Sequence, residues 1–130
     1  MRFAIHVQGG PADGDCARAA LDFAEAVLAA GHELARVFFQ GAGVHTASAL
    51  TVAPQDERDV AVAWAEFGRR HEVDLVVCVA SALRHGLLDE AEARRYERGQ
   101  GNLDTAFQIS GLGQLIDAAL NADRVVTFVP

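Results

Sequence analysis

Residues 74–86 read Asp-Leu-Val-Val-Cys-Val-Ala-Ser-Ala-Leu-Arg-His-Gly, an apolar run of strand type that passes at Cys78 into a segment of helical type. We expect a strand over residues 74–79 and one or two short helices between residues 80 and 96, broken at Gly86. Backbone N–H groups and the positive end of a helix dipole favour an anion at such a junction, where a cysteine forms its nucleophilic thiolate more readily. Cys78 is therefore the candidate catalytic residue.

The rest of the chain alternates between strand-type runs and segments with a helical spacing of apolar residues. The strand-type runs are residues 2–7, 34–39, 107–109 and 124–129. Helical spacing follows Cys16, Pro54 and Ser110. The last helix is predicted to bury a face made of Leu112, Leu115, Ile116, Ala119 and Leu120. Residues 40–53 form a connection that bears Gly, Ser and Thr, which we interpret as a candidate interface or lid.

Strands that alternate with helices predict a parallel sheet that is covered on both faces and built from right-handed crossovers. We expect one domain over residues 1–130, a three-layer α/β/α architecture with a mainly parallel sheet of about five strands. In sheets of this kind, ligands and chemistry collect outside the carboxyl ends of the strands. Both Cys78 and the glycine-rich loop over residues 9–14 are predicted to lie there.

The charge and cysteine content exclude several classes of function. The chain has 11 Arg and no Lys against 18 Asp plus Glu, for a net charge of −7, and its arginines are scattered among carboxylates, so we expect no direct binding of nucleic acid. No apolar run is long enough for a signal peptide or a membrane span. The two cysteines lie far apart in sequence, which indicates free thiols in a reducing compartment and a soluble, cytoplasmic protein.

Other candidate sites are weaker. The glycines at positions 9, 10 and 14 fit neither the dinucleotide nor the Walker spacing, so no cofactor is predicted. The five histidines have no partner at metal-ligand spacing, so no metal site is predicted. Cys16 lies among alanines at a helix start, which favours a packing role over that of an auxiliary thiol.

Cys78 itself has two readings at this stage. Cysteine is among the residues most often buried, and its neighbours Val76, Val77 and Val79 are all apolar, so an inert packing role stays open beside the nucleophilic one.

Several segments, in the same order from end to end, resemble the TusD/DsrE family of sulfur-relay proteins. They are residues 1–5, 10–12, 31–33, 37–39, 43–44, 78–86, 89–93 and 109–113. The resemblance covers nearly the whole chain and identifies Cys78 with the family's active cysteine. Ser81 and His85 depart from the commonest pattern, in which Ala and a second Arg occupy these positions, and neither change removes the sulfur acceptor.

The resemblance implies a sulfurtransferase that accepts a sulfur atom as a persulfide on Cys78 and passes it to a downstream carrier. In the TusD branch the relay serves 2-thiouridine synthesis at the tRNA wobble position, with a TusA-like donor and a TusE-like acceptor. In the DsrE branch it serves dissimilatory sulfur oxidation, with a DsrC-like acceptor. The implied partners are two homologous subunits, TusB- and TusC-like or DsrH- and DsrF-like, in a heterohexamer. We favour tRNA thiolation, with a scaffold or ligand-binding subunit as the alternative of another class.

Overall fold

The computed structural model describes all 130 residues, and its strands and helices alternate along the chain. The five strands are β1 (Arg2–Val7), β2 (Glu33–Phe39), β3 (Leu75–Cys78), β4 (Phe107–Ser110) and β5 (Arg124–Phe128). The helices are α1 (Cys16–Ala29), the 3-10 helix η1 (Gly41–Ala47), α2 (Val60–His71), α3 (Val79–Arg84), α4 (Glu90–Arg95) and α5 (Gly113–Asn121).

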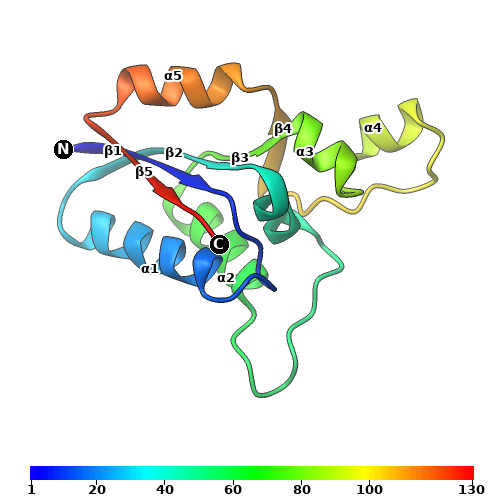
Figure 1. Cartoon of the computed structure of the whole chain (residues 1–130), viewed down its shortest axis with the longest axis horizontal. Helices are drawn as coiled ribbons and strands as arrows, with labels where there is room; N and C mark the ends of the chain where they lie inside the picture. The colour runs from blue at the N-terminus through cyan, green and yellow to red at the C-terminus, as the bar shows by residue number, and fades with distance from the viewer.

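The strands form one sheet in the order β4-β3-β2-β1-β5, and every neighbouring pair is parallel. This confirms the predicted α/β class with a parallel sheet. From β1 to β4 the chain moves steadily toward one edge, whereas the last crossover, through α5, returns past β1 to place β5 at the other edge. Because parallel crossovers are right-handed, this reversal puts α5 on the face opposite α1 and α2 (Figure 1).

The two faces of the sheet carry cores of unequal size. The larger lies under α1 and α2 and includes Trp64, which is completely buried and meets the ring of Phe39 edge-on. The smaller lies on the α5 side and consists of Phe38, Val76 and Cys78. Because side chains alternate along a strand, every second residue of β3 faces this thinner layer, and Cys78 is one of them.

The helix α5 starts later and packs differently from the predicted helix. Ser110 does not cap it, because this residue is the last of β4 and pairs in register with Cys78, so the N-cap is Leu112. Leu115 packs against the smaller core as predicted, and Ala118, which lies outside the predicted face, is buried. The other four residues of the predicted buried face are exposed, namely Leu112, Ile116, Ala119 and Leu120.

Two other expectations need correction. Pro54 opens a turn rather than a helix, and α2 begins at Val60, where the Asp59 carboxylate accepts a hydrogen bond of 3.1 Å from the Val62 N–H. Residues 40–53, predicted as a connection and interpreted as a candidate interface or lid, contain the 3-10 helix η1, which buries several of its residues in the larger core. The segment therefore helps to build the carboxyl edge of the sheet.

Candidate active site at the carboxyl edge of the sheet

Cys78 lies where the sequence places it, at the junction of β3 and α3. It is the last residue of the strand and the N-cap of the helix, with φ −59° and ψ 123°. The residue is 3% exposed and packs with Phe38 and Val76 of the sheet, while Leu115 of α5 packs on the same cluster. The thiol is free and lies under α5 rather than on the open surface.

Two polar residues flank Cys78 on the neighbouring strands. Ser110 pairs with it in register on β4. On the other side, Phe39 pairs with Val77, so Gln40 is the next residue opposite Cys78. Gln40 continues the extended backbone of β2, with φ −136° and ψ 159°, and its N–H donates to the Val7 carbonyl at 2.9 Å. The thiol therefore lies in a row between an amide and a hydroxyl.

His6 extends this polar group toward β1 and β5. It is 9% exposed, and its Nε2 lies 2.8 Å from Gln40 Oε1. Its Nδ1 lies 3.5 Å from Thr127 Oγ1 on β5. The spacing of the histidines along the sequence bears only on a metal-ligand role, so it gives no sign of this pairing. The alternation of side chains along β1 was the available signal, because it places His6 on the same face as Phe38 and Cys78.

The other residues at the end of α3 do not assist the thiol directly. His85 Nδ1 lies 3.0 Å from His45 Nε2 in η1, and the Arg84 side chain makes no hydrogen bond or ion pair. The helix itself has only six residues, so its dipole is much weaker than that of the longer helix that the sequence allowed. Ser81 is used structurally, because its Oγ accepts a hydrogen bond of 2.9 Å from the Gly41 N–H.

Cys16 is a packing residue in this structure. It is 8% exposed at the start of α1, and a Cβ built on Gly9 would come 2.7 Å from its Sγ. The thiol therefore fills the space that the absent side chain of Gly9 leaves. This arrangement agrees with the packing role that the sequence favours.

The glycine-rich loop lies at the carboxyl end of β1, but its geometry argues against a phosphate site. The Asp13 carboxylate accepts a hydrogen bond of 2.8 Å from the Gly10 N–H, so a negative charge already occupies the position at this N–H. A Cβ on Gly10 would come 2.6 Å from the Ala42 carbonyl oxygen of η1, so close packing explains this glycine. An adjacent pocket of ≈ 510 Å³ is lined by this loop, His45 and residues 51–60, and Cys78 does not reach it.

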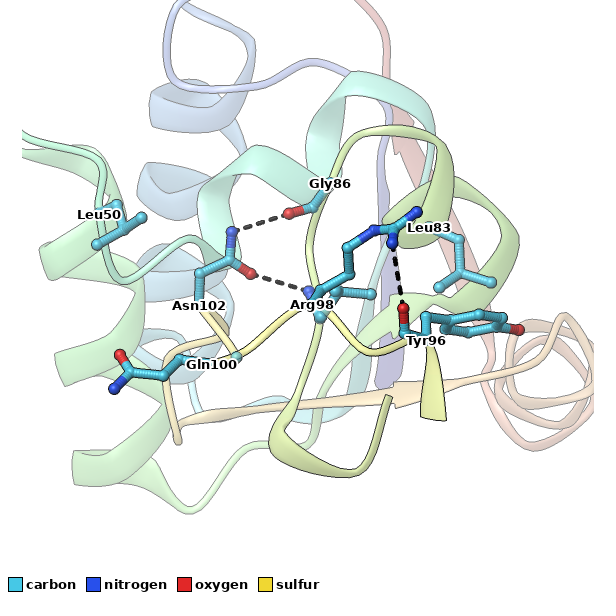
Figure 2. A pocket seen from close by; sticks show the side chains of 9 residues that line it. Leu50, Leu83, Gly86, Tyr96, Arg98, Gln100 and Asn102 are labelled. Atoms are coloured by element: carbon cyan, nitrogen blue, oxygen red, sulfur yellow. Dashed lines mark hydrogen bonds between the residues drawn. The ribbon is translucent and has the colours of Figure 1, made fainter. Parts of the chain in front are cut away.

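A second pocket, of ≈ 630 Å³, lies beside α3 and α4 (Figure 2). Its apolar wall is made by Leu50, Leu83, Leu88 and Tyr96. Asn102 ties its rim together, because its amide donates to the Gly86 carbonyl at 2.8 Å and accepts from the Leu88 N–H at 2.9 Å. Cys78 does not line this pocket either.

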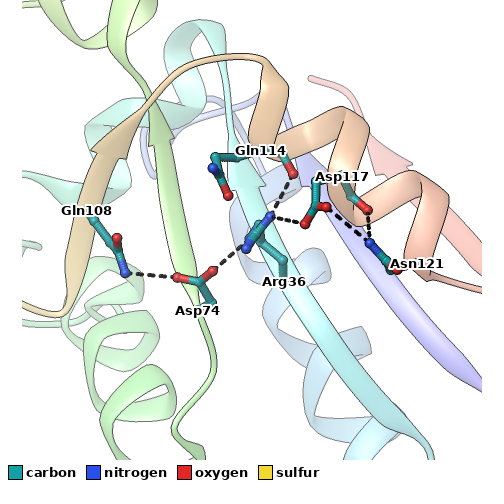
Figure 3. A network of polar contacts seen from close by, with 6 residues as sticks. All are labelled: Arg36, Asp74, Gln108, Gln114, Asp117 and Asn121. Carbon is teal, nitrogen blue, oxygen red and sulfur yellow. Dashed lines mark hydrogen bonds and ion pairs between the residues drawn. The ribbon is translucent and has the colours of Figure 1, made fainter.

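A polar network fastens α5 over the face that holds Cys78 (Figure 3). Arg36 of β2 donates to the Asp74 carboxylate at 2.7 Å, to the Gln114 carbonyl at 2.9 Å and to the Asp117 carboxylate at 3.3 Å. Gln108 of β4 donates to the other oxygen of Asp74 at 3.0 Å. The cover over the thiol is therefore held by polar contacts as well as by the apolar contact of Leu115.

No group of three or more His, Cys, Asp or Glu side chains is arranged to hold a metal ion. None of the helices has the length and apolar character that crossing a membrane requires.

The family assignment comes from comparison with known proteins. The model of the DsrE/DsrF-like family matches residues 1–128 of this chain. The chain belongs to this family. Among curated DsrE/DsrF-like relatives, a sulfurtransferase TusD homolog from Pseudomonas aeruginosa is 51% identical over 98% of this chain and 97% of its own length.

Other relatives have the same extent of coverage. A sulfurtransferase TusD from Salmonella dublin is 48% identical over 98% of this chain and 100% of its own. A protein named as the sulfurtransferase DsrE of Allochromatium vinosum is 46% identical over 98% of both chains. The crystal structure of the ychN protein from E. coli has the same fold, with a TM-score of 0.78, 19% identity and coverage of 98% and 99%. This DsrE/DsrF-like protein is thus a sulfurtransferase.

Proposed function

We propose that this sulfurtransferase carries sulfur as a persulfide on Cys78. The observation that carries the proposal is the position of this thiol at the carboxyl end of β3, between Gln40 and Ser110. The other cysteine, Cys16, is used to fill space beside Gly9. Of the two thiols in this chain, Cys78 is therefore the one whose polar neighbours suit an anion, as a sulfurtransferase that works through a cysteine requires.

The transfer step needs no cofactor. The Cys78 thiolate attacks the outer sulfur of a donor persulfide, a bond forms between Sγ and that sulfur, and the sulfur–sulfur bond of the donor breaks. The bonding electron pair leaves on the donor sulfur, which becomes a thiolate, while Cys78 becomes the persulfide. No net oxidation or reduction takes place. The reverse exchange with an acceptor thiolate passes the sulfur onward.

Access to the thiol requires a local movement, because Cys78 is 3% exposed. The cover is thin: on this side Leu115 of α5 packs against the core cluster, and much of the outer surface of α5 is exposed. Displacement of α5 would uncover the sulfur without disturbing the larger core under α1 and α2. We propose that a donor reaches Cys78 in this way, either in the free chain or in a complex.

We further propose that the relay serves 2-thiouridine synthesis at the tRNA wobble position. The support is the resemblance to TusD proteins, at 51% and 48% identity, beside 46% for DsrE. The proposed partners are TusB- and TusC-like subunits in a heterohexamer, a TusA-like donor and a TusE-like acceptor. The second candidate is the DsrE role in sulfur oxidation, with DsrH- and DsrF-like subunits and a DsrC-like acceptor, since the DsrE relative matches the same 98% of the chain.

Intact-mass analysis after incubation with a sulfane-sulfur donor tests the chemistry. The wild-type chain and Cys16→Ser are expected to gain one sulfur atom that dithiothreitol removes, and Cys78→Ser is expected to gain none. An unchanged mass in every sample, both for the chain alone and in the presence of its co-expressed neighbouring subunits, favours a scaffold in which Cys78 is inert.

A genetic test separates the two branches. The gene is introduced into a bacterium that lacks its own TusD, and 2-thiouridine is measured in tRNA hydrolysates. Wild type and Cys16→Ser are expected to restore the modified nucleoside, whereas Cys78→Ser is not. Persulfide formation without restoration, when the matching subunits are supplied together, favours the sulfur-oxidation branch.

A further inference from the structure

The structure holds a buried histidine that the transfer chemistry does not use. His6 is 9% exposed and faces the same side of the sheet as Cys78, and its Nε2 is hydrogen-bonded to Gln40 Oε1 at 2.8 Å. Burial of a polar ring on a thin apolar face costs free energy unless its nitrogens are satisfied. The contact with His6 thereby holds the Gln40 amide in place on the strand next to Cys78.

The hydrogen bonds of His6 define the direction in which Gln40 presents its amide. Because Gln40 Oε1 can only accept, the ring proton of His6 lies on Nε2, which donates to it across 2.8 Å, while Nδ1 lies 3.5 Å from the Thr127 hydroxyl. The oxygen of the amide is thus occupied, and its NH2 group makes no hydrogen bond within the protein. The pair leaves two N–H donors free at the carboxyl edge of the sheet.

The register places Gln40 on the strand next to Cys78 and on the same face of the sheet. Gln40 follows Phe39, which pairs with Val77, and its backbone stays extended, so its side chain leaves the same face as that of Cys78 from the adjacent position. Neighbouring strands lie about 4.8 Å apart, a spacing that a glutamine side chain bridges easily. The thiol makes no hydrogen bond in the resting structure, and a persulfide would place its outer sulfur about 2 Å further out.

The charged groups of the network on this face, Arg36, Asp74 and Asp117, are paired with one another, and Arg2 at the start of β1 pairs with Glu33. His6 is the titratable group that contacts Gln40, so it acts through Gln40 rather than on the sulfur. Hydrogen bonds from N–H donors to an anion are among the stronger ones in proteins.

We propose that Gln40, held in place by His6, is a positioning residue that donates a hydrogen bond to the sulfur anion on Cys78, both as thiolate and as persulfide. The inference deepens the proposed function and rests on it for its purpose. Its physical content is separate, because a donor beside the thiolate changes the reactivity of Cys78 toward any electrophile.

The test is the pH profile of Cys78 alkylation by iodoacetamide, followed by intact mass in a Cys16→Ser background. Gln40→Met removes the donors at similar length and is expected to slow alkylation at neutral pH about tenfold, with the midpoint of the profile about one unit higher. Gln40→Glu keeps the shape but replaces the donor with an anion, so an equal or larger loss is expected. His6→Phe keeps the ring contact with Phe38 and is expected to give a smaller loss in the same direction.

Gln100→Met is the matched control, because this glutamine lies on the rim of the pocket that Cys78 does not line and its side chain makes no hydrogen bond. Its profile is expected to match that of the parent, and thermal unfolding identifies any variant that loses its fold. The inference is overturned if Gln40→Met and Gln40→Glu, both folded, keep the parent profile. Failure of the parent to take up sulfur overturns the proposed function instead, and the alkylation profiles still decide the role of Gln40.

Discussion

Arg36 of β2 and Asp117 of α5 form an ion pair of 3.3 Å that joins the sheet to the helix covering Cys78. The same guanidinium holds the Asp74 carboxylate and the Gln114 carbonyl, and the Arg36 side chain is 17% exposed. Arg36 is therefore the residue that ties α5, the cover over the Cys78 thiol, to the sheet.

The first prediction concerns this link. Arg36→Met removes the contacts that hold α5, at a cost of about 1 kcal/mol after allowance for solvent screening, and raises the open population about fivefold. Alkylation of Cys78 in a Cys16→Ser background is expected to accelerate by the same factor. Arg58→Met, which breaks exposed pairs with Asp22 and Glu25 far from α5, is the control. Equal rates in the two variants would show that the network does not govern access.

The second prediction concerns the rim of the larger pocket. Asn102→Ala removes two hydrogen bonds, to the Gly86 carbonyl and from the Leu88 N–H, and is expected to lower the free energy of unfolding by about 2 kcal/mol. Gln100→Ala, on the same rim with no hydrogen bond of its own, is expected to change it by less than about 0.5 kcal/mol. Urea unfolding measures both, and similar values for the two variants contradict the assignment.

The third prediction concerns Trp64. Its indole N–H donates to the Ala17 carbonyl at 3.0 Å and thereby joins α2 to the first turn of α1. Trp64→Phe leaves a cavity as well as an unmade hydrogen bond, so a loss of about 3 kcal/mol is expected. Circular dichroism follows the unfolding, because Trp64 is the only tryptophan in the chain. The exposed Tyr96→Phe should leave the midpoint unchanged, and an equally stable Trp64→Phe would refute the role.

The fourth prediction compares two glycines of the carboxyl edge. A Cβ on Gly43 would clash with the Val7 carbonyl oxygen, and the nearest atoms all belong to the backbone of β1 and the residue after it, which cannot move aside easily. Gly43→Ala is therefore expected to lower the free energy of unfolding by about 3 kcal/mol. Gly14 has a φ of +68° but no atom within 4 Å of such a Cβ, so Gly14→Ala should cost about 1 kcal/mol. Thermal unfolding ranks the two variants, and the reverse order would mean that η1 moves freely against β1.

Much of the fold was predictable because the signals are local. The strands predicted over residues 34–39 and 74–79 match β2 and β3 to within one residue at each end, and Gly86, with φ +75°, separates α3 from α4 as predicted. The register of α5 was not predictable from spacing, because two apolar stripes compete on that helix. The sheet selects Leu115 and Ala118 for contact and leaves Ile116 exposed.

The candidate site, like the fold, was predictable from the sequence only in part. Cys78 is recognisable from its own neighbours in sequence, because the end of a strand and the start of a helix are both written in residues 74–86. The residues around Cys78 cannot be recognised in this way, because His6, Gln40 and Ser110 come from three other segments and only the sheet register brings these segments together.

The amino-acid sequence alone thus determined the class of fold, the order of its elements and the position of the candidate thiol at the end of a strand, because each depends on local patterns along the chain. The tertiary structure alone decided that this thiol is covered by α5 and that His6 and Gln40, which are joined by a hydrogen bond of 2.8 Å, share its face of the sheet. Burial and cross-strand contacts arise from strand order and helix register, which long-range packing sets.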